Sequence, residues 1–257
     1  MDLGLEGRVV VVTGGSSGLG AAAARLLLQE GAMVAVCGRD AERLAAQQRE
    51  LDDLGDALCA VADVRDPDAL QRFLDSVLER WGRVDGLVNN AGASSQGAFL
   101  SLDDAQWATD FDLKVLAAVR ALRRLHAPLA EHGGAVVNVL SVTAKAPAAG
   151  TMPTSVSRAA GLAMSKALSR EWGPDLIRVN SVLVGMVRSG QWERLAEDRG
   201  TTADELLASR AEELGIPLGR AGRAEEFAHL VAFLLSPTCG YLTGAAITFD
   251  GGLSTAL

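Results

Sequence analysis

A glycine-rich turn stands between a run of valines and a helical segment near the start of the chain. Val9 to Val12 lead into Thr13-Gly14-Gly15-Ser16-Ser17-Gly18-Leu19-Gly20. Glycines permit a tight reversal, and they let the backbone N–H groups at the start of the following helix approach a phosphate. In this strand-turn-helix setting the turn predicts a dinucleotide site. The residues predicted to contact the ligand are Gly14, Ser16, Ser17, Gly18, Leu19 and Gly20.

The residues after the next predicted strand indicate which dinucleotide fits. A carboxylate at that position accepts hydrogen bonds from a ribose 2′-hydroxyl and repels a 2′-phosphate. Here Gly38 is followed by Arg39, whose guanidinium suits a phosphate. Asp40 comes one residue later and is predicted to cap the helix that begins at Ala41. The sequence therefore favours NADP over NAD.

Short β-branched runs alternate with helical patterns along the chain, and several runs are apolar on consecutive residues, as in strands buried on both faces. This alternation predicts a doubly wound parallel sheet, a Rossmann-type α/β fold, in one domain over residues 1–257. The predicted strands are Arg8–Thr13, Met33–Cys37, Ala57–Val61, Gly86–Val88, Ala135–Leu140, Ile177–Leu183 and Ala246–Phe249. The predicted helices include Leu19–Glu30, Ala41–Leu54, Asp68–Trp81, Asp104–His132 and Ser155–Trp172.

A small helical insertion, residues 188–215, precedes the last helix and strand. Thr202-Ala203-Asp204-Glu205 has the pattern of a capping box and predicts a helix start there. The insertion is interpreted as a flap that covers a substrate, and a solvated pair of surface helices is the alternative.

The TGxxxGxG spacing at residues 13–20 resembles the short-chain dehydrogenase/reductase family, and other motifs extend the resemblance over nearly the whole chain. Asp63-Val64 resembles the family's adenine contact, and Asn89-Asn90-Ala91-Gly92 resembles its NNAG turn. Later landmarks are Arg178-Val179-Asn180, Tyr241-Leu242-Thr243-Gly244 and Asp250-Gly251-Gly252. The resemblance implies a nicotinamide cofactor that also contacts Asp63, Val64, Asn90, Ala91 and Gly92. It further implies a homodimer or homotetramer.

Most of the family's catalytic residues are replaced in this chain. Ser141 matches the serine that ends the fifth strand, but the tyrosine and lysine of the YxxxK pair fall at Thr154 and Arg158. Lys114 stands where the family has a relay asparagine. The single tyrosine, Tyr241, belongs to a later motif, so no other alignment restores the pair. The resemblance therefore predicts the cofactor site but not the usual proton donor.

The replacements lead to a hypothesis about the proton donor. A threonine hydroxyl is a far weaker acid than a phenol, and a guanidinium does not readily lose a proton. A buried Lys114 near Arg158 would be destabilised as an ammonium and would release its proton more easily. We therefore expect Lys114 to act with Ser141 as proton donor or oxyanion stabiliser, while Arg158 also bonds the nicotinamide ribose. A lysine on the surface of a long helix is the alternative.

Three functions are compatible with these residues. The favoured one is NADPH-dependent reduction of a carbonyl, or the reverse alcohol oxidation, through a non-standard proton relay. The second is a non-redox isomerase, dehydratase or cyclase on the same scaffold, and the third is a pseudoenzyme that keeps the cofactor. The retained nucleotide landmarks and Ser141 favour the first.

Charge and composition limit the possible partners. A net charge of −8 and a pI near 5.0 argue against nucleic acid or an anionic membrane surface as partner. The acidic N-terminus does not resemble a signal peptide, and no apolar run approaches the roughly 20 residues of a membrane span. No cluster has metal-ligand spacing. We therefore expect a cytoplasmic protein without a metal that acts on a small-molecule substrate.

Overall fold

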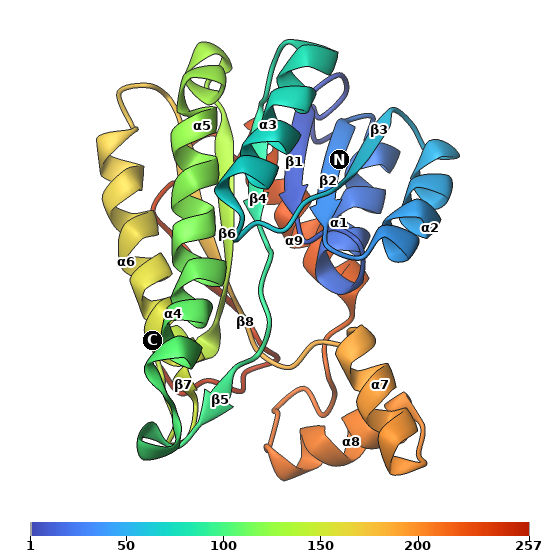
Figure 1. Ribbon diagram of the computed structural model, residues 1–257, viewed down its shortest axis with the longest axis vertical. Coiled ribbons are helices and arrows are strands. Elements are labelled where there is room, and N and C mark those ends of the chain that lie inside the picture. The colour runs from blue at the N-terminus through green and yellow to red at the C-terminus, as the bar shows by residue number, and fades with distance from the viewer. Residues whose placement is uncertain (1, 257) are drawn as a thin grey trace.

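The computed structural model describes residues 2–256, with all their side chains except those at 191 and 194. Its centre is a seven-stranded sheet of order β3-β2-β1-β4-β6-β8-β9, in which every neighbouring pair is parallel (Figure 1). The predicted doubly wound sheet is therefore confirmed. The strands are β1 (Val9–Thr13), β2 (Met33–Gly38), β3 (Ala57–Val61), β4 (Gly86–Asn89), β6 (Ala135–Ser141), β8 (Arg178–Val184) and β9 (Ala246–Phe249).

The consecutive valines of β1 show why its sequence lacks alternation. Val9 and Val11 pack into the core on one face of the sheet, whereas Val10 and Val12 pack into the core on the other. Successive strand residues point to opposite faces, so a strand covered on both sides needs apolar residues throughout.

Helices cover both faces of the sheet (Figure 1). Helices α1, α2 and α9 contribute to one core, and α3, α5 and α6 contribute to the other. Helix α6 begins at Thr154, one residue before the predicted start. The bounds are α1 (Gly18–Gln29), α2 (Ala41–Asp52), α9 (Ala224–Leu235), α3 (Pro67–Trp81), α5 (Ala117–His132) and α6 (Thr154–Glu171).

The predicted long helix over Asp104–His132 is confirmed in its two ends, but its middle turn is π-helical. The chain forms α4 (Asp104–Phe111), then a π-helical turn at Asp112–Leu116, and then α5. Such a turn inserts one residue, while the apolar spacing resumes beyond it, so the pattern alone does not reveal the interruption. Lys114 lies within this turn, and π-helical turns are frequent at functional sites.

A short antiparallel ribbon brings two distant loops together. Strand β5 (Gln96–Gly97) pairs with β7 (Met152–Pro153), directly before α6. The ribbon thereby places Ser95 beside Thr154, the first residue of that helix.

The insertion forms a separate lobe at the lower right of Figure 1. It contains α7 (Gly190–Arg199) and α8 (Ala203–Glu213), and the predicted capping box between Thr202 and Glu205 is present. The lobe has a small apolar cluster of its own, with Met186, Leu207, Ala211 and Ile216 buried. Within residues 2–256, no helix has the length and apolar character required to cross a bilayer.

Candidate active site

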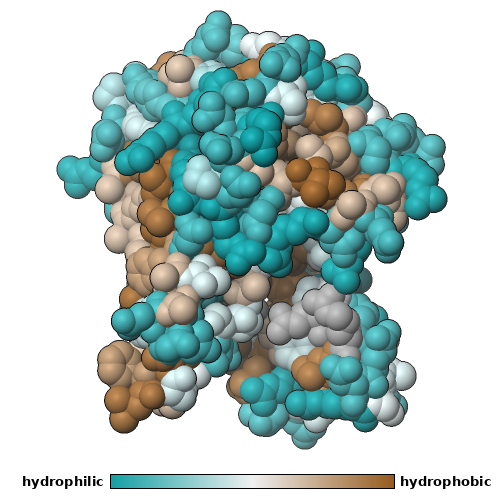
Figure 2. All heavy atoms as spheres, in the orientation of Figure 1, coloured by the Kyte–Doolittle hydropathy of each residue, from teal (hydrophilic) through white to brown (hydrophobic). Residues whose placement is uncertain are grey.

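A cleft of about 1010 Å³ opens at the carboxyl ends of the parallel strands. Its lining combines the glycine turn, the ends of β2, β4, β6 and β8, and the start of α7. Figure 2 shows the molecule hollowed between the end that carries the β5–β7 ribbon and the lobe of α7 and α8. Ligands of open α/β sheets bind at this edge, so the location fits a dinucleotide.

The glycine turn has the shape of a phosphate cradle. Gly14 has a φ of +68°, and a Cβ there would lie 2.8 Å from the Cα of Ala91. Helix α1 begins at Gly18, and its N-cap Ser17 makes no side-chain capping bond. The first-turn N–H groups are therefore available to an anion, as a pyrophosphate requires. Gly20 lies beneath the turn, where a Cβ would overlap the carbonyl oxygen of Gly14.

The other predicted turn residues line the cleft. They are Gly14, Ser16, Ser17, Gly18 and Leu19, joined from elsewhere by Arg39, Asp63, Val64, Asn90, Ala91, Gly92 and Arg158.

Asn90 connects the loop after β4 to the glycine turn. Its side-chain N–H donates to the carbonyl oxygens of Thr13 at 3.0 Å and Gly14 at 2.9 Å. In return the hydroxyl of Thr13 accepts the backbone N–H groups of Asn90 and Ala91, each at 3.1 Å. These bonds hold the turn in place without any charged group.

Two arginines line the cleft at the end of β2. Arg39 does so as predicted, and Arg43 on α2 does so as well. Asp40 accepts the backbone N–H of Arg43 at 3.0 Å, which confirms its predicted role as the cap of α2. Sequence reasoning missed Arg43, although its position in the first turn after Arg39 was a usable signal. Their guanidinium groups give this end the donors that a 2′-phosphate needs.

Asp63 is held by an arginine that sequence reasoning also missed. The Nη2 of Arg65 donates to its carboxylate at 2.6 Å, and the Arg65 backbone N–H donates at 3.0 Å. The side-chain bonds from Arg65 hold the pKa of Asp63 below its usual value, so this carboxylate stays ionised.

Lys114 is joined to Thr154 and Asp110 in a buried network. Its Nζ donates to the carboxylate of Asp110 and, at 2.7 Å, to the hydroxyl of Thr154. The other oxygen of Asp110 accepts the hydroxyl of Ser157 at 2.6 Å. Thr154 in turn donates to the carbonyl oxygen of Ser95 at 2.6 Å. Two of the residues expected at the reaction centre, Lys114 and Thr154, are thus in direct contact.

The Lys114 side chain is 0% exposed, which excludes the surface alternative. Burial lowers its pKa, the like charge of Arg158 lowers it further, and Asp110 opposes both effects. Asp110 was not among the predicted site residues, because the expected pKa of Lys114 was argued from the charge of Arg158 alone. The signal was present, because residues four apart on a helix are neighbours and form ion pairs.

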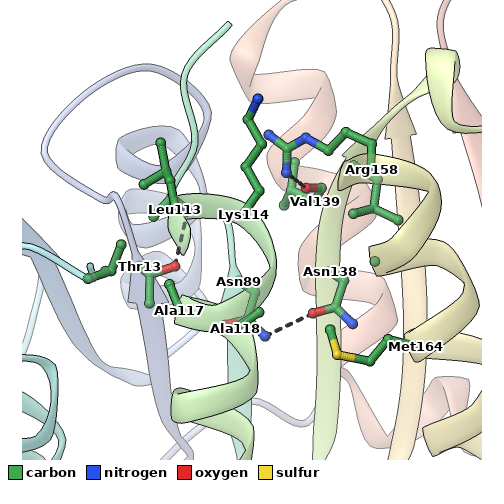
Figure 3. Close-up of a pocket in the computed structure, with 14 residues that line it drawn as sticks. Thr13, Asn89, Leu113, Lys114, Ala117, Ala118, Asn138, Val139, Arg158 and Met164 are labelled. Atoms are coloured by element: carbon green, nitrogen blue, oxygen red, sulfur yellow. Dashed lines mark hydrogen bonds between the residues drawn. The ribbon is translucent and has the colours of Figure 1, made fainter. Parts of the chain in front are cut away.

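Arg158 lines both the cleft and a small inner cavity of about 20 Å³, and Figure 3 shows it at the inner cavity. Its Nη1 donates to the carbonyl oxygen of Val139 at 2.8 Å. Its buried Nε has no hydrogen-bond partner among the described residues. Burial lowers the pKa of Arg158 to about 10, so the group remains charged at neutral pH. A Cβ at Gly92 would overlap Nη2, so only glycine leaves the guanidinium its place.

Ser141 ends β6 and lines the cleft with Thr154 and Arg158. Its hydroxyl oxygen accepts the backbone N–H of Thr143 at 3.2 Å and the Thr143 hydroxyl at 3.0 Å. Its own proton therefore remains available to a ligand in the cleft. Lys114 lines the inner cavity instead (Figure 3).

Two buried amides support the floor of this site. The Nδ2 of Asn89 donates to the Oδ1 of Asn138 at 2.8 Å, and Asn138 donates to Ser165 at 2.8 Å (Figure 3). These two side-chain hydrogen bonds connect β4, β6 and α6 beside the inner cavity, which Asn89 and Asn138 line. In the part of the chain that the structure describes, no group of three or more acidic, histidine or cysteine side chains is arranged to hold a metal.

Comparisons with known proteins agree with this architecture. Residues 14–254 match the sequence profile of the family described as enoyl-(acyl carrier protein) reductase. The 3-oxoacyl-(acyl-carrier-protein) reductase of Thermotoga maritima is 33% identical over 252 residues, which cover 97% of this chain and 98% of that protein.

Two solved structures are similar over almost their whole length. L-sorbose reductase of Gluconobacter frateurii, in complex with NADPH and L-sorbose, is 34% identical with a TM-score of 0.94, and both chains are covered at 100%. An NADPH-bound short-chain oxidoreductase of Pseudomonas aeruginosa, described as containing an atypical catalytic center, is 36% identical with a TM-score of 0.92. That match covers 97% of this chain and 98% of the other. The parallel sheet, the glycine turn and these matches together place the chain in the short-chain dehydrogenase/reductase family of oxidoreductases.

Proposed function

We propose that the protein is an NADPH-dependent reductase of a small carbonyl compound, also able to oxidise the corresponding alcohol, with Lys114 as the source of the proton. The observation that carries the proposal is the 2.7 Å bond from the buried Lys114 ammonium to the hydroxyl of Thr154, which itself lines the cleft. This bond connects a lysine of lowered pKa to the surface that a substrate touches.

The residues of the cleft fit NADPH along its length. The first-turn N–H groups of α1 would hold the pyrophosphate, and Arg39 with Arg43 would hold the 2′-phosphate. Asp63 and Val64 would meet the adenine, and Arg158 would meet the nicotinamide ribose. When bound, the nicotinamide supplies or accepts the hydride. The presence of NADPH in both solved relatives supports this choice over NADH.

Ser141 and Arg158 prepare the carbonyl for reduction. The Ser141 hydroxyl donates a hydrogen bond to the carbonyl oxygen and keeps its proton, and the guanidinium of Arg158 stabilises negative charge as it develops there. Arg158 keeps its own proton, because its pKa of about 10 lies well above neutral pH. Its contribution is therefore electrostatic.

Thr154 passes a proton between Lys114 and the substrate. The Thr154 O–H turns from the carbonyl oxygen of Ser95 to the substrate oxygen and gives up its proton there. In the same step its oxygen takes a proton from Nζ of Lys114, so a threonine alkoxide never accumulates. Lys114 becomes a neutral amine, leaving Asp110 and Arg158 as the two opposite charges. Alcohol oxidation follows the same path in reverse.

The proposal is tested by mixing the native protein and NADPH with a panel of ketones, aldehydes and oxo acids, and following the absorbance of the reduced nicotinamide. We expect at least one carbonyl to consume NADPH with formation of an equal amount of alcohol. Product without cofactor consumption would favour isomerase, dehydratase or cyclase chemistry instead. Cofactor binding without turnover on the whole panel would favour a pseudoenzyme. A cytoplasmic homodimer or homotetramer stays a prediction.

A further inference from the structure

The reaction centre carries more positive than negative charge. Lys114 and Arg158 are two cations, and Asp110 is the single carboxylate that bonds to either of them among the described residues. The carboxylates that line the cleft are Asp40 and Asp63, at the opposite, nucleotide end.

The carboxylates of Asp40 and Asp63 do not neutralise the extra positive charge at the reaction centre. Asp40 pairs with Arg43 at 3.1 Å, and Asp63 pairs with Arg65 at 2.6 Å. A buried unpaired charge is unfavourable, and Arg158 cannot readily relieve it by losing a proton. The centre is therefore suited to a ligand that brings a negative charge of its own.

One nitrogen of the Arg158 guanidinium is left for a ligand. Nη1 donates to the carbonyl oxygen of Val139, and Nε is enclosed by the protein, whereas Nη2 is not fully enclosed and has no partner among the described residues. Nη2 carries two N–H donors, and a charged N–H group forms a short, strong hydrogen bond to a carboxylate oxygen. Glycine at position 92 leaves Nη2 uncovered by a side chain.

The short side chain of Thr154 leaves space in the cleft for a substrate carboxylate. Thr154 stands where the family resemblance places a tyrosine, and its side chain is shorter by the whole aromatic ring. Thr154 and Arg158 both line the cleft one helical turn apart on α6, so the space above Thr154 adjoins Arg158.

We infer that the substrate carries a carboxylate next to its carbonyl, as in a 2-oxo or 3-oxo acid, and that Arg158 binds this carboxylate through Nη2. The inference rests on the proposed function, because it assigns the substrate class of the same site. Arg158 would then set substrate specificity as well as stabilise the developing charge, and this contact would replace the one with the nicotinamide ribose.

A binding experiment tests the anion site without requiring turnover. Oxamate, a carboxylate analogue of a 2-oxo acid, is titrated calorimetrically into the NADPH-saturated protein. We expect saturable binding that weakens by about tenfold or more in Arg158→Met, since a charge-assisted pair is lost. Arg158→Lys, which keeps the charge but not the planar guanidinium, should bind oxamate with an affinity between those of the native protein and Arg158→Met. Lys166→Met serves as the control, because this exposed α6 lysine bonds Gly244 and lies outside the cleft.

A turnover experiment tests the substrate class. Benzoylformate, its methyl ester and acetophenone share the aryl ketone and differ in the neighbouring charge. We expect kcat/KM for the acid to exceed that of both neutral compounds by about tenfold or more, and this preference to shrink in Arg158→Lys. Equal or better use of the ester would overturn the inference, as would oxamate binding that Arg158→Met leaves unchanged.

These outcomes separate the inference from the proposed function. If neutral ketones consume NADPH while oxo acids do not, the carbonyl reductase stands and the carboxylate site is wrong. If oxamate binds through Arg158 but no carbonyl consumes NADPH, the anion site stands and the reductase is wrong. Circular dichroism and NADPH titration of each variant identify any that fail to fold, and Arg158→Lys then carries the comparison.

Discussion

The two ends of the cleft are built in different ways. At the nucleotide end the backbone forms the site: glycines 14, 18 and 20 shape the turn, and Asn90 ties it down through carbonyl oxygens. At the reaction centre side chains form the site, with Lys114, Asp110 and Thr154 bonded to one another in the interior. We expect a site built from backbone atoms to lose its ligand affinity when a single Cβ is added to one of its glycines. In a network of bonded side chains, the effect of replacing one member depends on which of its partners remain.

The largest expected effect is at the nucleotide end. Gly20→Ala would place a Cβ against the carbonyl oxygen of Gly14 and the amide of Asn90, so the turn must move. We expect NADPH binding to weaken by about 100-fold or more, since the N–H groups leave their places. Gly173→Ala is the matched control, because a Cβ there meets its neighbours at ordinary distances of 3.4 and 3.6 Å. Fluorescence titration with NADPH measures both, and equal affinities would contradict a backbone-built site.

The reaction centre should respond to the loss of one partner of the buried ion pair. Lys114→Met leaves the Asp110 carboxylate buried without its cation, which should lower the free energy of unfolding by about 3 kcal/mol. Adding Asp110→Asn removes the unpaired charge and should restore much of the loss. Urea unfolding of the two single variants and the double variant gives the coupling. Additive effects would show that the two side chains do not act as a unit.

A smaller effect is expected at the 2′-phosphate end. Arg39→Ala should weaken NADPH by about tenfold or more, because a charge-assisted bond to phosphate is lost, and leave NADH unchanged. Arg49→Ala is the control, since this exposed arginine lies on α2 outside the cleft, and its one hydrogen bond among the described residues goes to the carbonyl oxygen of Ala45. An unchanged NADPH affinity in Arg39→Ala, or tighter binding of NADH than NADPH by the native protein, would rule out the assigned preference.

The subtlest effect is the pH dependence of the reaction centre. The pKa of Lys114 is lowered in the folded protein, so carbonyl reduction should slow as pH rises through that value, which lies below 10.5. Between that value and 10.5 the unfolded state binds more protons than the folded state, so the Lys114 contribution makes stability rise with pH. The Lys114→Met/Asp110→Asn variant should lack both trends. Their persistence there would assign them to another group.

The fold was predictable because its main signal is repeated along the chain. Consecutive apolar residues such as Val9 to Val12 identify a strand covered on both faces, and all seven predicted strands are present in the sheet. The cap at Asp40 and the capping box at Thr202 were predictable for a local reason, since each is fixed by residues within one turn.

The reaction centre was only partly predictable. The identities of Ser141, Thr154, Arg158 and Lys114 come from position along the chain, and the spacing of four residues was a signal for Asp110. The sequence does not show that a π-helical turn lies at Asp112–Leu116, or that both side chains of the pair are buried. A single extra residue in a turn leaves the apolar pattern nearly unchanged. The network also joins residues 47 and 59 positions apart, which no local spacing reveals.

If Lys114 supplies the proton for carbonyl reduction, its removal should slow the chemical step itself. The measurement is the single-turnover rate of NADPH oxidation with a carbonyl substrate, compared between the native protein and Lys114→Met/Asp110→Asn. Lys166→Met and Asp110→Asn serve as controls for lysine loss and for the carboxylate change. We expect a rate about 100-fold lower or more in the double variant, with NADPH affinity unchanged. A double variant that reduces the carbonyl at the native rate would show that the proton has another source.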